Sequence, residues 1–148
     1  MLIQVPELGA LVSHLGNYIR SQKVFDAWVE ELTVLAVARE LDCRYVWGAH
    51  RPQGERAGLS APTIEAVRAG RAPAGLADRE ALVVRFAHEL LRDHRVSDAT
   101  FDAIATWLGK EGATLLTSTV GHYCHICAVN NAFDVAPAPG ADVLPVGG

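Results

Sequence analysis

Three residues in the first third of the chain, Glu31, Cys43 and His50, have side chains and a spacing that could carry chemistry. Cys43 and His50 are seven positions apart, so both lie on one face of the helix predicted for this stretch. The same seven positions separate them by about 10 Å along the axis, which exceeds the ~3 Å of a direct thiol–imidazole hydrogen bond. We therefore expect a substrate, a water or a residue from another helix between them. Glu31 is a candidate because adjacent antiparallel helices bring together residues that are symmetric about their turn.

Position 46 distinguishes between the kinds of thiol chemistry. It lies one helical turn before His50, where a side chain can contact the imidazole, and it is occupied by Val46, so no thiol stands there. An alternative interpretation is that these residues only pack in the core. Cysteine is often a small buried apolar residue, and Tyr45 and Trp47 can also belong to a core. A histidine in such a position often does no more than donate a hydrogen bond to a carbonyl. From the spacing alone, packing is favoured over chemistry.

A second group of histidines and cysteines lies near the end of the chain, in the run HYCHIC over residues 122–127. On a helix, Cys124 and Cys127 form one pair at i, i+3, and His122 and His125 form another. The two pairs are displaced by roughly 200° around the helix, so a single tetrahedral site would need at least two ligands from elsewhere. We therefore predict no metal here and expect packing and hydrogen-bonding roles for most of these side chains.

Helical periodicity runs through most of the chain and predicts an all-α single domain of about six or seven helices, with no strand-like alternation. The predicted helices cover residues 6–19, 25–41, 42–57, 62–68, 78–94, 97–108 and 115–133. The second of these is apolar almost all round, which predicts burial in the core or in an interface. Gly109 is expected to end the sixth.

Two segments and three further histidines are given no chemical role. Residues 69–77 form the predicted internal loop, and the Pro/Gly-rich tail at 136–148, beyond a domain at 1–135, is expected to drape over a neighbouring surface or stay mobile. His14, His88 and His94 are predicted to lie at the surface or at helix ends.

Composition excludes several classes of protein. The chain has 148 residues, a formal charge of -4 and 50% hydrophobic residues, enough for one domain with a core, and it has no Lys/Arg block for nucleic acid. Three cysteines suggest free thiols in a reducing compartment rather than a disulfide framework. The chain start lacks an export signal, and no apolar run approaches the roughly 20 residues of a membrane span, so we expect a soluble cytoplasmic protein without membrane or nucleic-acid partners.

The stretch around Cys43 resembles a known family. Glu31-Leu32, the run VARELDCRYVWGAH at 37–50 and RAGLS at 56–60 resemble the carboxymuconolactone decarboxylase family in its alkylhydroperoxidase D (AhpD)-like branch. VSD at 96–98, GHY at 121–123 and NAF at 131–133 are also similar to that family. The resemblance covers about residues 20–135.

This resemblance implies an all-helical AhpD-like fold that assembles as homo-trimers or homo-hexamers, with active sites near the subunit contacts. In the peroxidase members, a glutamate, a Cys-x-x-Cys pair and a following histidine form a proton relay, and Glu31, Cys43 and His50 match the glutamate, the first cysteine and the histidine. Val46 replaces the second cysteine, and Tyr45 replaces the histidine between the two. This departure removes the dithiol that would attack a peroxide and then close a disulfide.

The helix that carries the HYCHIC run borders the site in this family. The resemblance therefore extends the expected substrate pocket to Tyr45, Val46, Trp47, His122, Tyr123 and His125. The missing thiol at position 46 also raises the hypothesis that Cys124 or Cys127 is a distant resolving thiol for Cys43.

Three functions remain open at this point. The first is a cofactor-free acid/base enzyme acting on a small carboxylated or lactone ring, such as a decarboxylase, with His50 as acid or base and Glu31 as its orienting partner. The second is a one-cysteine hydroperoxide reductase of peroxiredoxin type, in which Cys43 is oxidised and reset by an external thiol. The third is a non-catalytic oligomer that binds a small ligand. None of the three needs a cofactor or a metal.

Overall fold

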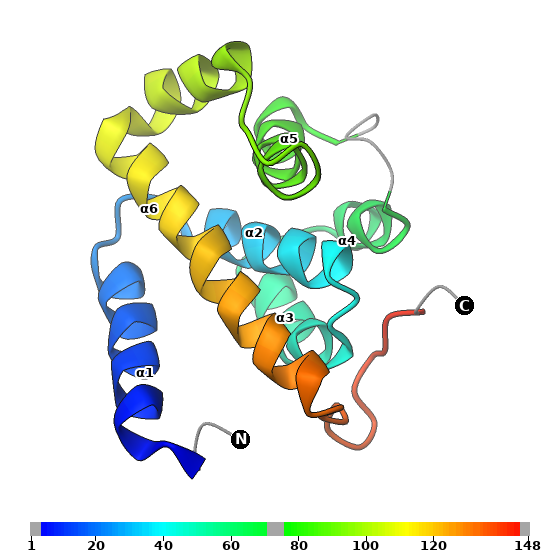
Figure 1. Ribbon diagram of the computed structural model, residues 1–148. Coiled ribbons are helices and arrows are strands. Elements are labelled where there is room, and N and C mark those ends of the chain that lie inside the picture. Colours follow the sequence, from blue (N-terminus) through cyan, green and yellow to red (C-terminus); the bar gives the residue numbers. More distant parts are fainter. Residues whose placement is uncertain (1–3, 71–75, 146–148) are drawn as a thin grey trace.

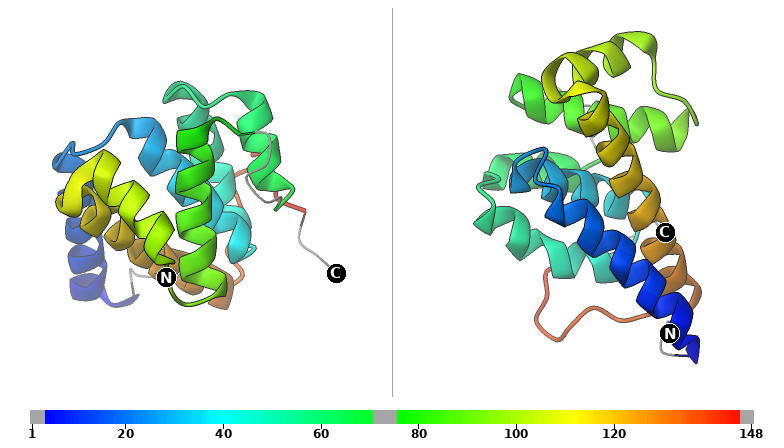
Figure 2. Two further views of the ribbon diagram at one scale, coloured as in Figure 1. Left: turned by 90° about the horizontal axis from the view of Figure 1, so that it is seen from above. Right: turned by 90° about the vertical axis from the view of Figure 1, so that its left-hand side faces the viewer.

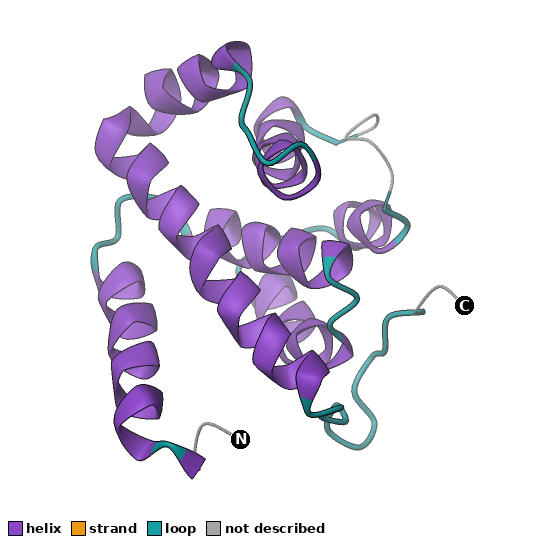
Figure 3. Cartoon of the chain, in the orientation of Figure 1, coloured by secondary structure: helices purple, strands orange, loops and turns teal. Residues whose placement is uncertain are grey.

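The computed structural model describes residues 4–70 and 76–145, and within these ranges the chain forms six helices and no strand (Figure 3). The helices are α1 (Pro6–Ser21), α2 (Ala27–Glu40), α3 (Arg44–Arg56), α4 (Ala61–Arg68), α5 (Asp78–Arg92) and α6 (Asp98–Ala132). The predicted all-α fold is therefore confirmed. The predicted loop over residues 69–77 falls mostly on residues 71–75, which lie outside the described part of the chain.

Several helix ends have local causes in the sequence. The Ser60 hydroxyl accepts a hydrogen bond from the Thr63 N–H at 3.2 Å, and Ser97 does the same for Thr100 at 3.3 Å. Each bond satisfies one of the free N–H groups of a first helical turn, so α4 and α6 begin where these caps stand. At the start of α1, Pro6 occupies a position that needs no N–H donor.

The central element is α2, which packs against α3, α4, α5 and α6 (Figure 1). Its residues from Glu31 to Ala38 are all buried, as expected for a helix that is apolar on every side. α6 crosses the face formed by α2 and α3, and α1 packs along the second half of α6, which two views show side by side (Figure 2).

The predicted helix end at Gly109 is confirmed. The backbone there has φ 72° and ψ 171°, which is not helical, so α6 consists of two helices that meet at a kink. The second helix begins directly after Gly109 and not at residue 115 as predicted. A residue with this backbone conformation is almost always glycine.

The tail lies on the surface of its own chain. After α6, residues 133–145 contain no helix and run back across α3 and α4. Leu144 is buried in the core, and Asp142 accepts a hydrogen bond from Arg68. Of the two expectations for the tail, draping over a neighbouring surface describes residues 136–145.

Candidate functional site

The predicted acid/base pair is joined by a hydrogen bond. Glu31, in the second turn of α2, and His50, in the second turn of α3, meet with His50 Nδ1 at 2.8 Å from Glu31 Oε2. Both side chains are close to nine-tenths buried. A carboxylate oxygen accepts this hydrogen bond from Nδ1, so in the neutral form of the imidazole the lone pair lies on Nε2. Glu31 thus orients the imidazole so that Nε2 can take up a proton.

Tyr123 and Arg20 extend this pair. The ring of Tyr123 meets that of His50 edge to face, with centroids 5.1 Å apart. Arg20 donates a hydrogen bond from Nη2 to the Tyr123 hydroxyl at 2.5 Å and pairs through Nε with Glu30 at 2.9 Å. Burial raises the pKa of Tyr123 to about 12, although the Arg20 charge opposes the shift. The phenol is therefore protonated near neutral pH, and its hydrogen is available to a ligand.

A cavity of about 260 Å³ opens beside these side chains, between α1, α3 and α6. Its walls are Val12, Ser13, Gly16, Asn17, Arg20, His50, His122, Tyr123 and Ile126. Gly16 allows α1 to approach α6, because a Cβ at this position would lie 2.8 Å from His122 Nε2. Burial and the nearby Arg20 charge lower the pKa of His122, so this imidazole is neutral near pH 7. The cavity therefore combines one cationic group with neutral hydrogen-bonding groups, which suits a small anionic ligand.

Cys43 occupies a different position, at the N-cap of α3. Its side chain is fully buried, as is that of Cys127 on α6. Hydrogen bonding with Cys127, and less strongly with the backbone at Val46 and Tyr45, lowers the pKa of Cys43 to about 7 against the opposing effect of burial. The same hydrogen bonding with Cys43, together with burial, raises the pKa of Cys127.

Cys43 does not line the cavity that His50 lines. On α3, Cys43 and His50 are seven positions apart, and their partners on α6, Cys127 and Tyr123, are four positions apart. α3 and α6 therefore pack in opposite directions, with a thiol pair at one level and an imidazole–phenol pair at another.

Only some of the other residues expected in the substrate pocket line the cavity. His122 and Tyr123 line the cavity, whereas the side chains of Tyr45 and His125 are exposed to solvent. Val46 is buried in the core. These three lie outside the cavity that His50 lines.

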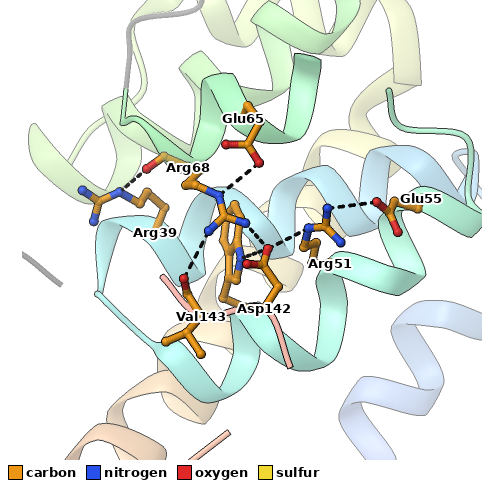
Figure 4. Close-up of polar contacts among 8 residues, drawn as sticks. Arg39, Arg51, Glu55, Glu65, Arg68, Asp142 and Val143 are labelled. Carbon is orange, nitrogen blue, oxygen red and sulfur yellow. Dashed lines mark hydrogen bonds and ion pairs between the residues drawn. The ribbon is translucent and has the colours of Figure 1, made fainter. Parts of the chain in front are cut away.

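Trp47 lies on the side of α3 that the tail covers. Its indole N–H points to Asp142 at 3.5 Å, and the Arg68 guanidinium stacks over its ring at 5.1 Å. Figure 4 shows Asp142 between Arg68 and Arg51, which holds the tail against α3 and α4. Trp47 therefore contributes to the tail contact and not to the cavity.

Two groups of residues were not anticipated from the sequence. Arg20, Gly16 and the other cavity residues of α1 show no motif, because they reach the site only through the packing of α1 on α6. The one local signal is Gly16, a small residue in the middle of an otherwise regular amphipathic helix. His88, expected at the surface or at a helix end, is instead buried within α5, with Nε2 3.3 Å from Glu40 on α2.

The described residues offer no cluster of three or more histidine, cysteine, aspartate or glutamate side chains that could hold a metal ion. In the same ranges, none of the helices is both long enough and apolar enough to cross a bilayer.

Comparison with models of known protein families shows the family of the chain. The model of the carboxymuconolactone decarboxylase family matches residues 6–89, which is more than half of the sequence. The chain belongs to the carboxymuconolactone decarboxylase family. The matched range includes Glu31, Cys43 and His50 and ends before α6, so the similar motifs at 96–98, 121–123 and 131–133 lie outside it. Searches of curated proteins and of solved structures returned no match.

Proposed function

We propose that this chain is a cofactor-free acid/base enzyme that decarboxylates, or performs a related lyase step on, a small carboxylated or lactone ring. The observation that carries the proposal is the hydrogen bond from His50 Nδ1 to Glu31, which leaves Nε2 as the basic nitrogen beside the cavity. A fixed tautomer with a carboxylate behind it is the usual arrangement of a general base.

The other cavity residues support this chemistry. Arg20 is placed to bind a substrate carboxylate, and the Tyr123 hydroxyl can donate to an oxygen on which negative charge develops. When the carbon–carbon bond to the departing carboxylate breaks, its electron pair moves to a neighbouring carbonyl as an enolate. Carbon dioxide leaves as this bond breaks. His50, after taking up a proton from solvent at Nε2, delivers it to the carbon of the enolate.

The test is carbon dioxide release from a panel of small cyclic 3-oxo acids and carboxylated lactones. We expect His50→Gln to lower kcat by about 10²–10⁴-fold and Glu31→Gln to lower it less, while Cys43→Ala keeps most of the activity. Loss of turnover in Cys43→Ala with full activity in His50→Gln would reject the assignment of the base.

A second candidate, closer to the AhpD-like branch, is reduction of hydroperoxides by Cys43. The observation that favours it is the pKa of about 7, because the thiolate is the form that attacks a peroxide. Consumption of hydrogen peroxide by the reduced protein, measured with and without Cys43→Ser, tests it. A rate no faster than that of the Cys43→Ser variant would exclude it.

A further inference from the structure

The carboxylate of Glu30 is the strongest feature beside the cavity that the proposed reaction does not use. Glu30 lies on α2 next to Glu31, and its Oε1 is 2.9 Å from Arg20 Nε on α1. The Glu30 side chain is only 14% exposed, so solvent screens its charge less than that of a surface carboxylate.

Arg20 divides its hydrogen-bond donors between two partners within the protein. A guanidinium has five N–H donors. Nε faces Glu30, and Nη2 donates to the Tyr123 hydroxyl at 2.5 Å, so two of the five are engaged. The others can hold one ligand carboxylate through both of its oxygens. Among the described residues that line the cavity, Arg20 is the only lysine or arginine.

The charges around the cavity leave room for one ligand carboxylate. Glu30 offsets Arg20, and Glu31 offsets His50 whenever that imidazole is protonated. Burial raises the pKa of the Glu30 carboxyl, although Arg20 opposes the shift, and the Glu31 charge adds to it. The surroundings therefore already disfavour negative charge. A first ligand carboxylate gains the contact with Arg20, whereas a second meets repulsion from Glu30 and Glu31 without a cation of its own.

We propose that Glu30 restricts the cavity to ligands with a single carboxylate, so that the substrate is a cyclic 3-oxo monoacid or a lactone with one carboxyl group beside its carbonyl. This assignment rests on the proposed decarboxylation and names its substrate class. The carboxylate held by Arg20 is then the one that leaves as carbon dioxide, and a proton from solvent replaces it on the ring. The product is a neutral ketone or lactone.

The contacts of Arg20 suit a reaction in which the charge moves. The Tyr123 hydroxyl accepts a hydrogen bond from Arg20 and can donate its own hydrogen to the enolate oxygen, so the guanidinium stabilises the charge at its new position as well. Because Glu30 shares the guanidinium, the substrate carboxylate is held less tightly than by an unpaired arginine. Weaker binding of the ground state favours kcat, since interactions made equally in both states do not accelerate the reaction.

The test compares two ligands of the same size that differ in charge, cis-cyclopentane-1,3-dicarboxylate and its monoamide. Neither has a 3-oxo group, so neither can be decarboxylated during the measurement. At pH 7 both carboxyl groups of the diacid are ionised, and on one small ring they lie within the ~10 Å screening length of about 0.1 M salt. Isothermal titration calorimetry under these conditions measures both affinities. We expect the wild type to bind the monoamide about tenfold more tightly than the diacid.

Glu30→Gln removes the charge and keeps the shape of the side chain. We expect it to bind the diacid about tenfold more tightly than the wild type does, so that the preference for the monoamide almost disappears. Glu30→Asp keeps the charge and should keep the preference. Asp102→Asn, at an exposed position near the start of α6, makes the same change of net charge and is the matched control.

The ratio of the two affinities separates charge from structure. A variant with a disturbed fold would bind both ligands more weakly, and circular dichroism checks that the helices are retained. Equal affinity of the wild type for the two ligands overturns the restriction, as does a preference that Glu30→Gln leaves unchanged. Absence of binding by either ligand also overturns it.

Release of carbon dioxide tests the reaction separately. Faster release from 3-oxo diacids than from the matched monoacids would overturn the assigned substrate class. The expected preference in binding, without carbon dioxide release from any 3-oxo acid, would reject the decarboxylase and leave a binding site for monocarboxylates.

Discussion

The pKa of the buried Cys43 thiol is lowered to about 7, chiefly by hydrogen bonding with Cys127 and less by the backbone at Val46 and Tyr45. The backbone contribution follows from the sequence, because a residue at a helix N-cap lies beside the free N–H groups of the first turn. The Cys127 contribution comes from a residue 84 positions away, and only the fold brings it there.

This arrangement predicts that Cys127→Ala raises the pKa of Cys43 from about 7 to the ordinary cysteine value of about 8.5 or above, because the hydrogen-bond partner with the largest effect is removed while burial remains. At pH 7 the thiolate fraction should fall from about one half to a few per cent. The pH dependence of iodoacetamide alkylation at Cys43, read by mass spectrometry, measures it. Cys124→Ala is the matched control and should leave the midpoint within ~0.3 units; an equal shift in both variants would contradict the assignment.

At the scale of the elements, helical periodicity predicted all six helices because the spacing of apolar residues is local. It also predicted the helix end at Gly109, although it placed the start of the next helix at residue 115 and not directly after the kink. It also misplaced His88, because the burial of one histidine near a helix end depends on the helix opposite.

The bend in α6 predicts a specific role for Gly109. Its φ of 72° with ψ of 171° is strained for any residue with a Cβ, so Gly109→Ala should lower the free energy of unfolding by about 1–3 kcal/mol. Gly121, on the same helix, is exposed and has no atom within 4 Å of a built Cβ. Gly121→Ala should be neutral or stabilise the protein by up to ~1 kcal/mol. Urea unfolding of both variants measures the difference, and equal effects would argue against the bend.

The contact between α2 and α5 predicts a dependence on pH. Burial, more than the nearby Arg92 charge, lowers the pKa of His88, although Glu40 opposes the shift. The unfolded chain therefore binds this proton more readily, and the stability that neutral His88 contributes is lost as the pH falls below its unfolded value of about 6.5.

We expect the melting temperature to fall between pH 7 and pH 5, and to fall less in His88→Gln. The control is His94→Gln, since His94 is exposed just beyond the same helix. The same decrease in His88→Gln as in the wild type would show that His88 does not contribute.

For the whole molecule, α1 presents different residues on two faces. One face lines the cavity with Arg20, and the other exposes a stripe of Leu8, Leu11, Leu15 and Tyr18. Leu11 is 68% exposed, and the stripe has the spacing of one helix face. Such a stripe is typical of a surface covered by another protein. The expected homo-trimer or homo-hexamer, like the expected cytoplasmic location, stays a prediction, and we propose this stripe as part of the subunit contact.

Sedimentation velocity tests that contact. The wild type should sediment as a species larger than the 15.9 kDa chain, and Leu11→Glu with Leu15→Glu should shift it toward the monomer. Ala10→Glu adds a carboxylate on α1 outside the stripe and should leave the assembly intact. A monomeric wild type would overturn the proposal.

The sequence by itself determined the helical class, the approximate helix limits and the candidates Glu31, Cys43 and His50, because each depends on spacing within one or two adjacent helices. The tertiary structure decided that Arg20 and Tyr123 join His50, that Cys127 rather than Cys124 contacts Cys43, and that Trp47 packs under the tail. These are contacts between segments far apart in the chain, and they depend on how closely whole helix faces approach. A small residue such as Gly16 sets that approach, and nothing in the local pattern reveals which distant side chain it admits.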